Sequence, residues 1–398
     1  MKYKITAIVT TVFIFISLIG FLVVGGRLIQ QECNLDGFSF SSLKNLFIFF
    51  KDENAKMVFC HDEYVDVNGA YHQITGKKYV KGYDSVAKLK NNMLIYADIE
   101  KENFDGAFRV ESLKEFDAAL QEKNIDFLYV LAPAKLSRYD YNEYLPYKVI
   151  SPGANSASLV DALEKSDLSY IDIESQMRTD GISHYGSFFK SDHHWLPQTG
   201  FYANTLICEY LKDNSGFEFN ADILNIDRYN QDTYTKSFLG TQGRGTGTVF
   251  SPVDDMTLIY PRFDTDILVN TGGDITEGTF FDAIFRMEYL TQKADTNDND
   301  YFVYLGGSVP WQLIKNNNAD NDKKIVLVAD SFSGVCAPYL SLACSELHLL
   351  DGRWFKGESI YDYAVRIEAD IVISLHNASA ITDDRFFNFM QMRPVVQE

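Results

Sequence analysis

The stretch Ser191-Asp192-His193-His194-Trp195 is the point from which the rest of this chain can be interpreted. In an extended segment, side chains two positions apart lie on the same face, while neighbouring side chains lie on opposite faces. Asp192 can then orient the imidazole of His194, with His193 pointing away. A carboxylate that holds an imidazole supplies two members of a Ser-His-Asp triad, whose members are defined by geometry and not by chain order.

A serine that could complete this triad occurs much later in the chain. Residues 325–328 form an apolar run typical of a buried strand, and Ser331 follows directly in the turn Ala329-Asp330-Ser331-Phe332-Ser333. A serine hydroxyl needs an adjacent base to become a nucleophile. We therefore predict Ser331 as nucleophile, His194 as base and Asp192 as the group that holds the tautomer of His194.

Two other interpretations of the 191–195 stretch stay open. Two histidines beside a tryptophan could form a polar edge of the core, and Asp and His are both metal ligands. The chain has no H-E-x-x-H motif, and adjacent histidines on an extended segment diverge, which disfavours a metal site. We expect neither a metal nor another cofactor.

Residues 191–197 resemble the signature of the DHHW family. They are also similar to the D-x-H-W segment of alginate O-acetyltransferase (AlgJ/AlgX-like) proteins, which belong to the SGNH hydrolase superfamily. In that family the Asp-x-His pair precedes a serine in a G-D-S-F-like turn, and Asp330-Ser331-Phe332 matches in the same order, with Ala329 in place of glycine. The similarity extends from roughly Asn91 to the C-terminus and includes the stretch 238–244.

The resemblance implies a fold and further site residues. The implied fold is a three-layer α/β domain of SGNH-hydrolase type around a mainly parallel sheet. The superfamily places an asparagine in its oxyanion hole, and Asn377 follows an apolar run that ends at Leu375, although it could equally cap a helix. Arg244, flanked by glycines, could bind a substrate carboxylate or carbonyl, or could simply be solvated. Ser333 is the expected helix cap, which leaves Ser331 free.

The pattern of apolar segments independently favours an α/β fold. Continuous apolar runs alternate with segments of helical periodicity, and this alternation is typical of a parallel sheet covered by helices on both faces. The runs expected as strands are 127–131, 168–173, 325–328, 347–350 and 371–375. The segments expected as helices are one capped by Ser112, 157–165, one starting at Pro197, 336–345 and 360–367. Ligands of such sheets bind beyond the carboxyl ends of the strands, which is where Ser331 lies.

The alternation lapses between residues 217 and 318, where Asp, Asn, Gly and Thr are common. We expect an inserted region with loops and a few antiparallel strands. The acidic run at 295–300 does not follow the calcium-loop pattern, because Asp300 occupies the position that requires glycine. The predicted organisation is an anchor at 1–27, a juxtamembrane stem at 28–90 and a catalytic domain at 91–398. An extension of the main domain is an equal alternative for the stem.

The N-terminus predicts export. Lys2 and Lys4 precede an apolar run from Ile5 to Val24, which matches the roughly 20 residues that span a bilayer. Val23-Val24-Gly25-Gly26-Arg27 is not an A-x-A-like cleavage site, so we expect an uncleaved anchor. The lysines would stay inside, and the rest of the chain would lie outside the cytoplasm, at the cell surface.

Composition limits the possible partners. The chain has 398 residues, 46% of them hydrophobic, so a large core can form. Its net charge of -19 argues against nucleic acid or an anionic membrane surface as a partner, because phosphates attract Lys and Arg. None of the five cysteines forms a C-x-x-C motif, which disfavours a zinc ribbon or a thioredoxin-like site.

These observations predict a membrane-anchored, extracytoplasmic protein that acts on acetyl esters of a cell-surface polysaccharide. The resemblance implies O-acetyl transfer, with a membrane-bound O-acyltransferase as acyl supplier. Ester hydrolysis would use the same triad with water as acceptor, and the sequence does not separate the two. A non-catalytic glycan-binding or scaffold protein of a cell-envelope modification complex is the rival class, which the intact triad disfavours. A metal-dependent hydrolase comes third.

Overall fold

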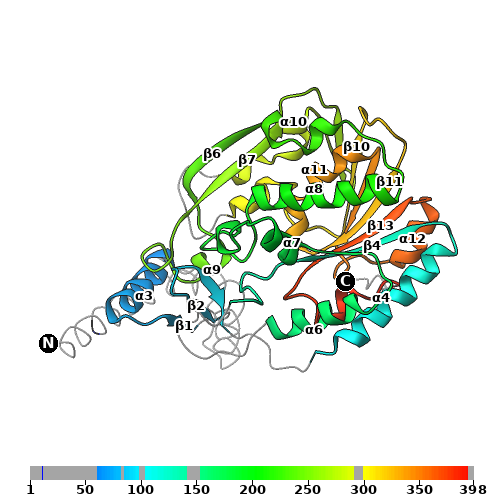
Figure 1. Cartoon of the computed structure of the whole chain (residues 1–398). Coiled ribbons are helices and arrows are strands. Elements are labelled where there is room, and N and C mark those ends of the chain that lie inside the picture. The colour runs from blue at the N-terminus through cyan, green and yellow to red at the C-terminus, as the bar shows by residue number, and fades with distance from the viewer. Residues whose placement is uncertain are drawn as a thin grey trace, which may run out of the picture.

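The computed structural model describes residues 61–81, 85–97, 104–140, 153–290 and 299–392, together with Thr11. Its centre is an eight-stranded sheet with the strand order β5-β4-β13-β11-β12-β10-β8-β9 (Figure 1). The strands are β4 (Asp126–Ala132), β5 (Tyr170–Asp172), β8 (Ile267–Thr271), β9 (Asp274–Gly278), β10 (Trp311–Asn316), β11 (Lys324–Ala329), β12 (Glu346–Leu350) and β13 (Ile371–Asn377).

The half of the sheet from β5 to β12 is parallel. Val372 of β13 pairs with Val326 on one side and with Phe127 on the other. The three apolar runs predicted to share one parallel sheet are therefore direct neighbours in it, and the prediction is confirmed. β10, β8 and β9 continue the sheet in antiparallel pairing, which makes it mainly parallel.

Alternation along the central strands builds two separate cores, one on each face of the sheet. On β4, Leu128 and Val130 belong to one buried cluster, whereas Phe127, Tyr129 and Leu131 belong to the other. Helices cover both clusters, α8 on one side of β4 and β13 and α4 on the opposite side (Figure 1). The first layer contains α7 (Ile173–Thr179), α8 (Pro197–Asn214) and α11 (Ala337–Leu340), and the second contains α4 (Gly106–Gln121), α6 (Gly153–Glu164) and α12 (Ile360–Arg366).

Two helices differ from the sequence prediction. α4 begins seven positions or so earlier than expected, because Asp105, not Ser112, caps it by accepting a hydrogen bond from the amide of Ala107. The single helix predicted over 336–345 is instead a short α11 between two 3-10 turns, 331–335 and 341–343. Pro338 lies in the first turn of α11 and has no N–H, so it separates this helix from the 3-10 turn at 331–335.

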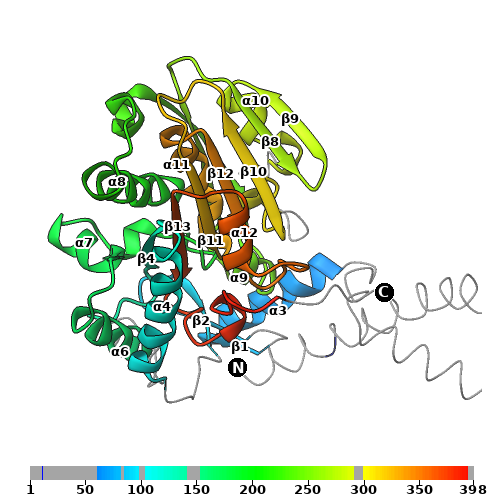
Figure 2. The same cartoon turned by 90° about the vertical axis from the view of Figure 1, so that its right-hand side faces the viewer.

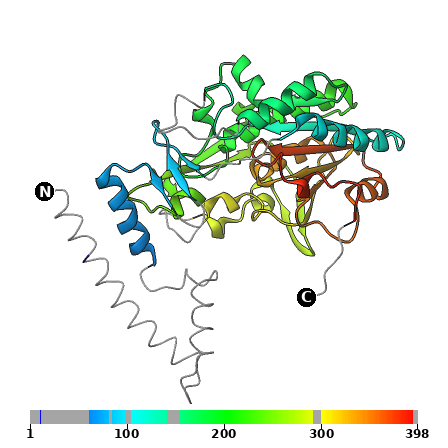
Figure 3. The ribbon, with the colours of Figure 1, turned by 90° about the horizontal axis from the view of Figure 1, so that it is seen from below.

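The region before residue 100 packs against the main domain. It contains α3 (His61–Thr75) and a three-stranded sheet of β1 (Tyr79–Val80), β2 (Val86–Lys88) and β3 (Leu94–Tyr96). The amide of Leu94 donates to the carbonyl of Lys190 at 2.8 Å, and Lys88 Nζ donates to the carbonyl of Phe250 at 2.5 Å. Figure 2 shows α3 and this small sheet beside α9 (Thr241–Arg244), and Figure 3 shows α3, in blue, next to the small sheet. The domain boundaries at residues 27 and 90 stay predictions.

The antiparallel strands predicted between 217 and 318 are present. β6 (Tyr229–Phe238) and β7 (Asp254–Pro261) form a two-stranded ladder, and β8, β9 and β10 extend the main sheet. Most of the acidic run at 295–300 lies outside the described residues.

Among the residues that the structure describes, no helix combines the length and the apolar character needed to cross a bilayer. The predicted anchor, Ile5 to Val24, lies outside the described residues apart from Thr11.

Candidate active site

Three side chains from two distant segments form a continuous hydrogen-bonded chain. Asp192 Oδ1 lies 2.5 Å from Nδ1 of His194, and Nε2 of His194 lies 2.7 Å from Oγ of Ser331. Asp192 and His194 are buried, with 1% and 7% of their side chains exposed, whereas Ser331 is half-buried. The structure thus brings together all three residues of the predicted triad, with the serine at the solvent side.

The local conformation of the motif differs from the prediction. Residues 190–194 form a bend and not an extended strand. Asp192 Oδ1 accepts a hydrogen bond from the backbone amide of His194 at 2.9 Å as well as facing its ring. The carboxylate therefore meets the imidazole because the chain folds back on itself, and the side-by-side geometry of residues i and i+2 in a strand is not the cause.

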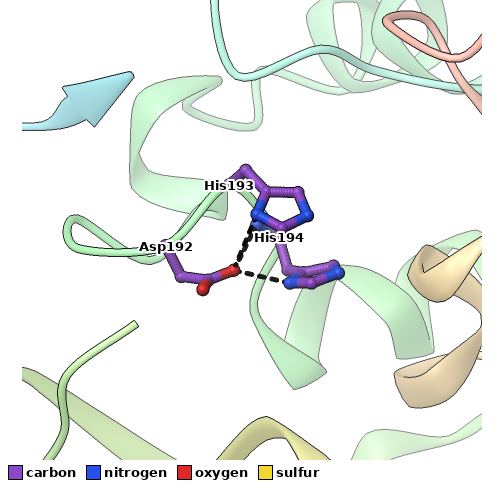
Figure 4. A group of neighbouring side chains, drawn as sticks. All are labelled: Asp192, His193 and His194. Carbon is purple, nitrogen blue, oxygen red and sulfur yellow. Dashed lines mark hydrogen bonds and ion pairs between the residues drawn. The ribbon is translucent and has the colours of Figure 1, made fainter. Parts of the chain in front are cut away.

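The same bend places His193 beside the triad, whereas an extended segment would point His193 away from it. The rings of His193 and His194 have centroids 3.8 Å apart, and His193 Nδ1 lies 3.4 Å from Asp192 Oδ1 (Figure 4). One third of the His193 side chain (33%) is exposed, and its ring also contacts Tyr96 and Phe332. Its enclosed surroundings, and then the neighbouring His194, lower the pKa of His193 to about 3, so it is neutral at physiological pH.

Electrostatics fix the proton arrangement within the triad. Burial raises the pKa of Asp192, but His193, His194 and the hydrogen bonds to the carboxylate outweigh burial and hold that pKa well below its usual value. An ionised carboxylate can only accept, so the proton on the His194 ring must be on Nδ1 and point to Asp192. Nε2 is then the free acceptor that faces the hydroxyl of Ser331.

The turn that carries Ser331 is held by Asp330. One carboxylate oxygen of Asp330 accepts from the amide of Phe332 at 2.9 Å, and the other accepts from the amide of Asn377 at 2.7 Å. Ser333 was expected to be the cap, but Asp330 caps this turn, and the Ser333 hydroxyl donates to the carbonyl of Asp330. The Ser331 hydroxyl is the one left for His194. Burial is the main cause that raises the pKa of Asp330 to about 6.

Aromatic side chains fix the orientation of the His194 ring. Tyr301 stacks on it with a centroid separation of 4.0 Å and an interplanar angle of 12°, and its hydroxyl donates to the Ser331 carbonyl at 3.0 Å. Phe332 lies on the ring as well, at 5.2 Å. Trp195 is fully buried and donates from Nε1 to the Phe332 carbonyl at 2.9 Å, which ties the two triad segments together.

Backbone amides of the glycine-rich stretch 238–244 donate hydrogen bonds to the segment that carries the triad carboxylate. The amide of Thr241 donates to the second carboxylate oxygen of Asp192 at 2.6 Å, and the amide of Gly240 donates to the Ser191 hydroxyl at 2.9 Å. A Cβ on Gly240 would lie 2.1 Å from the Cβ of Asp192, so only glycine fits this close approach. This gives a physical reason for the stretch that the resemblance singled out.

Asn377 is buried at the end of β13, and its side chain is occupied within the turn. Its amide nitrogen donates to the Pro133 carbonyl at 2.6 Å, and its amide oxygen accepts from the backbone of Ser379 at 2.9 Å. No helix begins at residue 378, so the capping alternative is wrong. Asn377 thus has a structural role beside Asp330, and a role in an oxyanion hole stays a prediction.

Arg244 ends the short helix α9, one turn after Thr241. Its Nη2 donates to the Thr241 hydroxyl at 3.2 Å, and its Nε is buried and has no hydrogen-bond partner within the described part of the chain. The structure places this guanidinium next to the segment that touches Asp192. Its predicted contact with a substrate carboxylate or carbonyl stays a prediction.

A metal could in principle use this cluster, because one ligand atom each of Asp192, His193 and His194 lies within 4.8 Å of the others. Zinc binds its ligands at about 2.0–2.2 Å in a tetrahedral arrangement, which separates any two ligand atoms by roughly 3.3 Å. The 2.5 Å between Asp192 Oδ1 and His194 Nδ1 is too short for that arrangement and fits a charge-assisted hydrogen bond.

Residues 96–221 match the family model described as SGNH hydrolase-like domain, acetyltransferase AlgX. This part of the chain is therefore similar to an SGNH hydrolase-like domain, as the resemblance predicted. The structure of this chain is similar to that of Bacillus cereus PatB1, which was solved with a sulfonyl adduct. The TM-score is 0.62 at 17% identity, and the match covers 77% of this chain and 100% of PatB1. A DHHW family protein from Eubacterium siraeum gives a TM-score of 0.59 at 18% identity, over 80% and 98%. These two likenesses establish the fold, and comparison with curated proteins found no match.

Several supporting residues of the SGNH-like site had no strong signal in the sequence. Tyr301, Lys135 and Asp254 each lie in polar or loop segments, and each reaches the triad segments only in the folded protein. Lys135, in Ala-Pro-Ala-Lys after a predicted strand, offered the best clue, because ligand-facing groups gather at the carboxyl ends of strands.

Proposed function

We propose that this protein transfers O-acetyl groups to, or removes them from, a cell-surface polysaccharide by covalent catalysis on Ser331. The observation that carries the proposal is the unbroken Asp192–His194–Ser331 hydrogen-bonded chain, with an ionised aspartate at one end and a half-buried hydroxyl at the other. The match of residues 96–221 to the family model described as SGNH hydrolase-like domain, acetyltransferase AlgX, supports acetyl transfer as the reaction class.

In the first half-reaction, Oγ of Ser331 attacks the carbonyl carbon of the acetyl donor while Nε2 of His194 takes the hydroxyl proton. Asp192 stabilises the imidazolium that forms. The tetrahedral intermediate collapses by breaking the bond to the leaving group, which takes the proton from His194. Acetyl-Ser331 is left. The Phe332 and Ser333 amides are bound by Asp330, so we assign the amide of Ser331 as the backbone donor to the oxyanion.

In the second half-reaction, a hydroxyl group of the acceptor approaches acetyl-Ser331. His194 removes its proton, the oxygen attacks the acetyl carbon, and the bond to Ser331 Oγ breaks as that oxygen regains a proton from His194. A sugar hydroxyl gives a new O-acetyl ester, and water gives acetate. The balance between transfer and hydrolysis depends on how well the acceptor excludes water.

The loop after β12 presents an exposed aromatic side chain and leaves the sheet at the same edge as the turn that carries Ser331. The loop after β12 starts at Asp351, which lines the same small cavity as Ser331, and continues to Trp354, whose surface is 51% exposed. β12 and β11 are parallel neighbours, so their loops leave the same edge of the sheet. We assign Trp354 to acceptor binding. The control for Trp354→Ala is Phe108→Ala, because Phe108 is an aromatic residue that is 70% exposed on α4.

Exposure to the cell exterior, an N-terminal anchor and a membrane-bound O-acyltransferase as acyl supplier are parts of the same proposal. They rest on the apolar run at 5–24 and on the resemblance. The rival, a non-catalytic glycan-binding or scaffold protein, would gain nothing from a serine within 2.7 Å of a correctly oriented imidazole.

The test is a single-turnover assay with p-nitrophenyl acetate. The unaltered protein should release a burst of nitrophenol and gain one acetyl group on Ser331 by peptide mass spectrometry. Ser331→Ala should lose both, with an unchanged melting temperature, because the hydroxyl contributes little packing. Turnover that survives in Ser331→Ala, or that chelators abolish in the unaltered protein, would disprove the proposal.

A further inference from the structure

Lys135 is a buried lysine on the loop that follows β4, with only 6% of its surface exposed. Its Nζ donates to the carbonyl of Lys190 at 3.0 Å, to the carbonyl of Asp192 at 2.5 Å and to the side-chain oxygen of Gln242 at 3.3 Å. An ammonium group has three N–H donors. All three are used, and two of them hold carbonyls of the bend that carries the triad aspartate.

Asp254, at the start of β7, accepts hydrogen bonds from backbone amides of the same bend. One carboxylate oxygen accepts from the amide of Lys190 at 2.8 Å. The other accepts from the amide of Ser191 at 2.7 Å and from the Ser191 hydroxyl at 2.6 Å. Lys135 and Asp254 therefore hold peptide groups of the same bend by opposite ends, because the cation binds carbonyls and the anion binds amides.

We propose that Lys135 and Asp254 form a charged clamp that positions Asp192 for catalysis. Burying charges costs free energy, and a buried ion is tolerated where hydrogen bonds and a counter-charge compensate. Here the compensating acceptors are peptide groups of the triad bend itself. The bend has no regular secondary structure to hold it, so these polar contacts determine where the Asp192 carboxylate lies.

The clamp is distinct from the catalytic residues. Neither Lys135 nor Asp254 has a hydrogen bond to His194 or Ser331 among the described residues, so both act through Asp192. The inference rests on the proposed function, because a positioning role requires a reaction at Ser331. Losing the clamp should lower kcat and leave KM nearly unchanged, since the substrate-facing groups stay in place.

Lys135→Met tests the clamp, because methionine keeps the length and removes the donors. We expect kcat on p-nitrophenyl acetate to fall roughly 100-fold, the size of effect that a misplacement of about 1 Å produces. Lys88→Met is the matched control. Lys88 is also buried (7% exposed) and donates to a backbone carbonyl, that of Phe250, but among the described residues it has no hydrogen bond to the bend that carries Asp192. Lys88→Met should lose similar stability and keep kcat within about twofold of the unaltered protein.

A pH profile of the unaltered protein tests the clamp without any substitution. Burial, opposed by the charges of Asp254 and Asp192, lowers the pKa of Lys135 to about 7. His193 and His184 also lie near Lys135, and both have strongly lowered pKa values, so they stay neutral in this range. As pH rises through about 7, the lysine loses a proton, and a neutral amine has too few donors for three acceptors. We expect kcat to decline there.

Stability should move the other way. Lys135 titrates lower in the folded than in the unfolded chain, so between pH 7 and about 10 the unfolded state binds more protons, and this group then favours folding as pH rises. A falling kcat without a falling melting temperature would therefore support a positioning role. A kcat for Lys135→Met near that of the unaltered protein, an equal loss in Lys88→Met, or a kcat that stays flat to pH 9 would overturn the clamp. If Ser331→Ala kept its activity, the proposed function would fail instead.

Discussion

Replacing Gly240 by alanine should damage the site through one contact. An added Cβ would lie 2.1 Å from Asp192 Cβ, 2.6 Å from its Cα and 2.7 Å from its Oδ2. Real Cβ atoms do not approach a backbone neighbour so closely, so either Asp192 or the 240–241 segment must shift. The backbone of Gly240, with φ -67° and ψ 174°, suits alanine, so the steric contact is the only cause.

The size of the effect follows from that overlap. Ordinary carbon contacts begin near 3.5 Å, so the 2.1 Å separation requires a displacement of more than about 1 Å. Such a shift would lengthen the 2.5 Å bond from Asp192 to His194, and misplacements of this size cost about 100-fold in rate. Overpacking should also lower the free energy of unfolding by about 1–3 kcal/mol.

The assay is the single-turnover release of nitrophenol, with denaturant unfolding measured in parallel. Gly245→Ala serves as control, because this glycine follows the same stretch directly, has φ -75°, and its added Cβ would meet nothing closer than 3.8 Å. We expect the control to retain activity within about twofold of the unaltered protein. A Gly240→Ala protein with undiminished turnover would refute the argument that this close approach positions the triad carboxylate.

Three further predictions follow from the same geometry. Asp192→Asn should lower kcat roughly 10⁴-fold, because the amide leaves His194 in the wrong tautomer. Since its folded pKa is depressed, Asp192 should also stabilise the fold above about pH 4 and lose that contribution at lower pH, so the unfolding midpoints of the variant and the unaltered protein should converge in acid. In steady-state kinetics, Tyr301→Phe should keep most of the kcat, and Tyr301→Ala should lose about tenfold or more. The reason is that the ring stacked on His194 orients the imidazole, and phenylalanine keeps that ring. Arg138→Met should cost about 3–5 kcal/mol in urea unfolding, because it strands the buried carboxylates of Asp172 and Glu174; an unchanged midpoint would contradict this.

The sequence by itself determined the sheet and the members of the triad. The apolar runs around Phe127, Val326 and Ile373 are long enough and apolar enough that only strands buried on both faces suit them, and they pair as neighbours. Asp192, His194 and Ser331 were recognisable because their residue types and their order match a known motif, and such local signals do not depend on the rest of the fold.

Only the tertiary structure decided how these residues meet. A spacing of two residues is compatible with a strand or with a bend. The bend is held by Lys135, Gly240 and Asp254, which lie far from the motif in the sequence, so these contacts cannot be predicted from the motif itself. The position of His193 follows from that bend, so the strand argument failed for it. Hydrogen bonds between remote peptide groups and side chains leave no periodicity in a sequence, because each is one contact that depends on the whole fold.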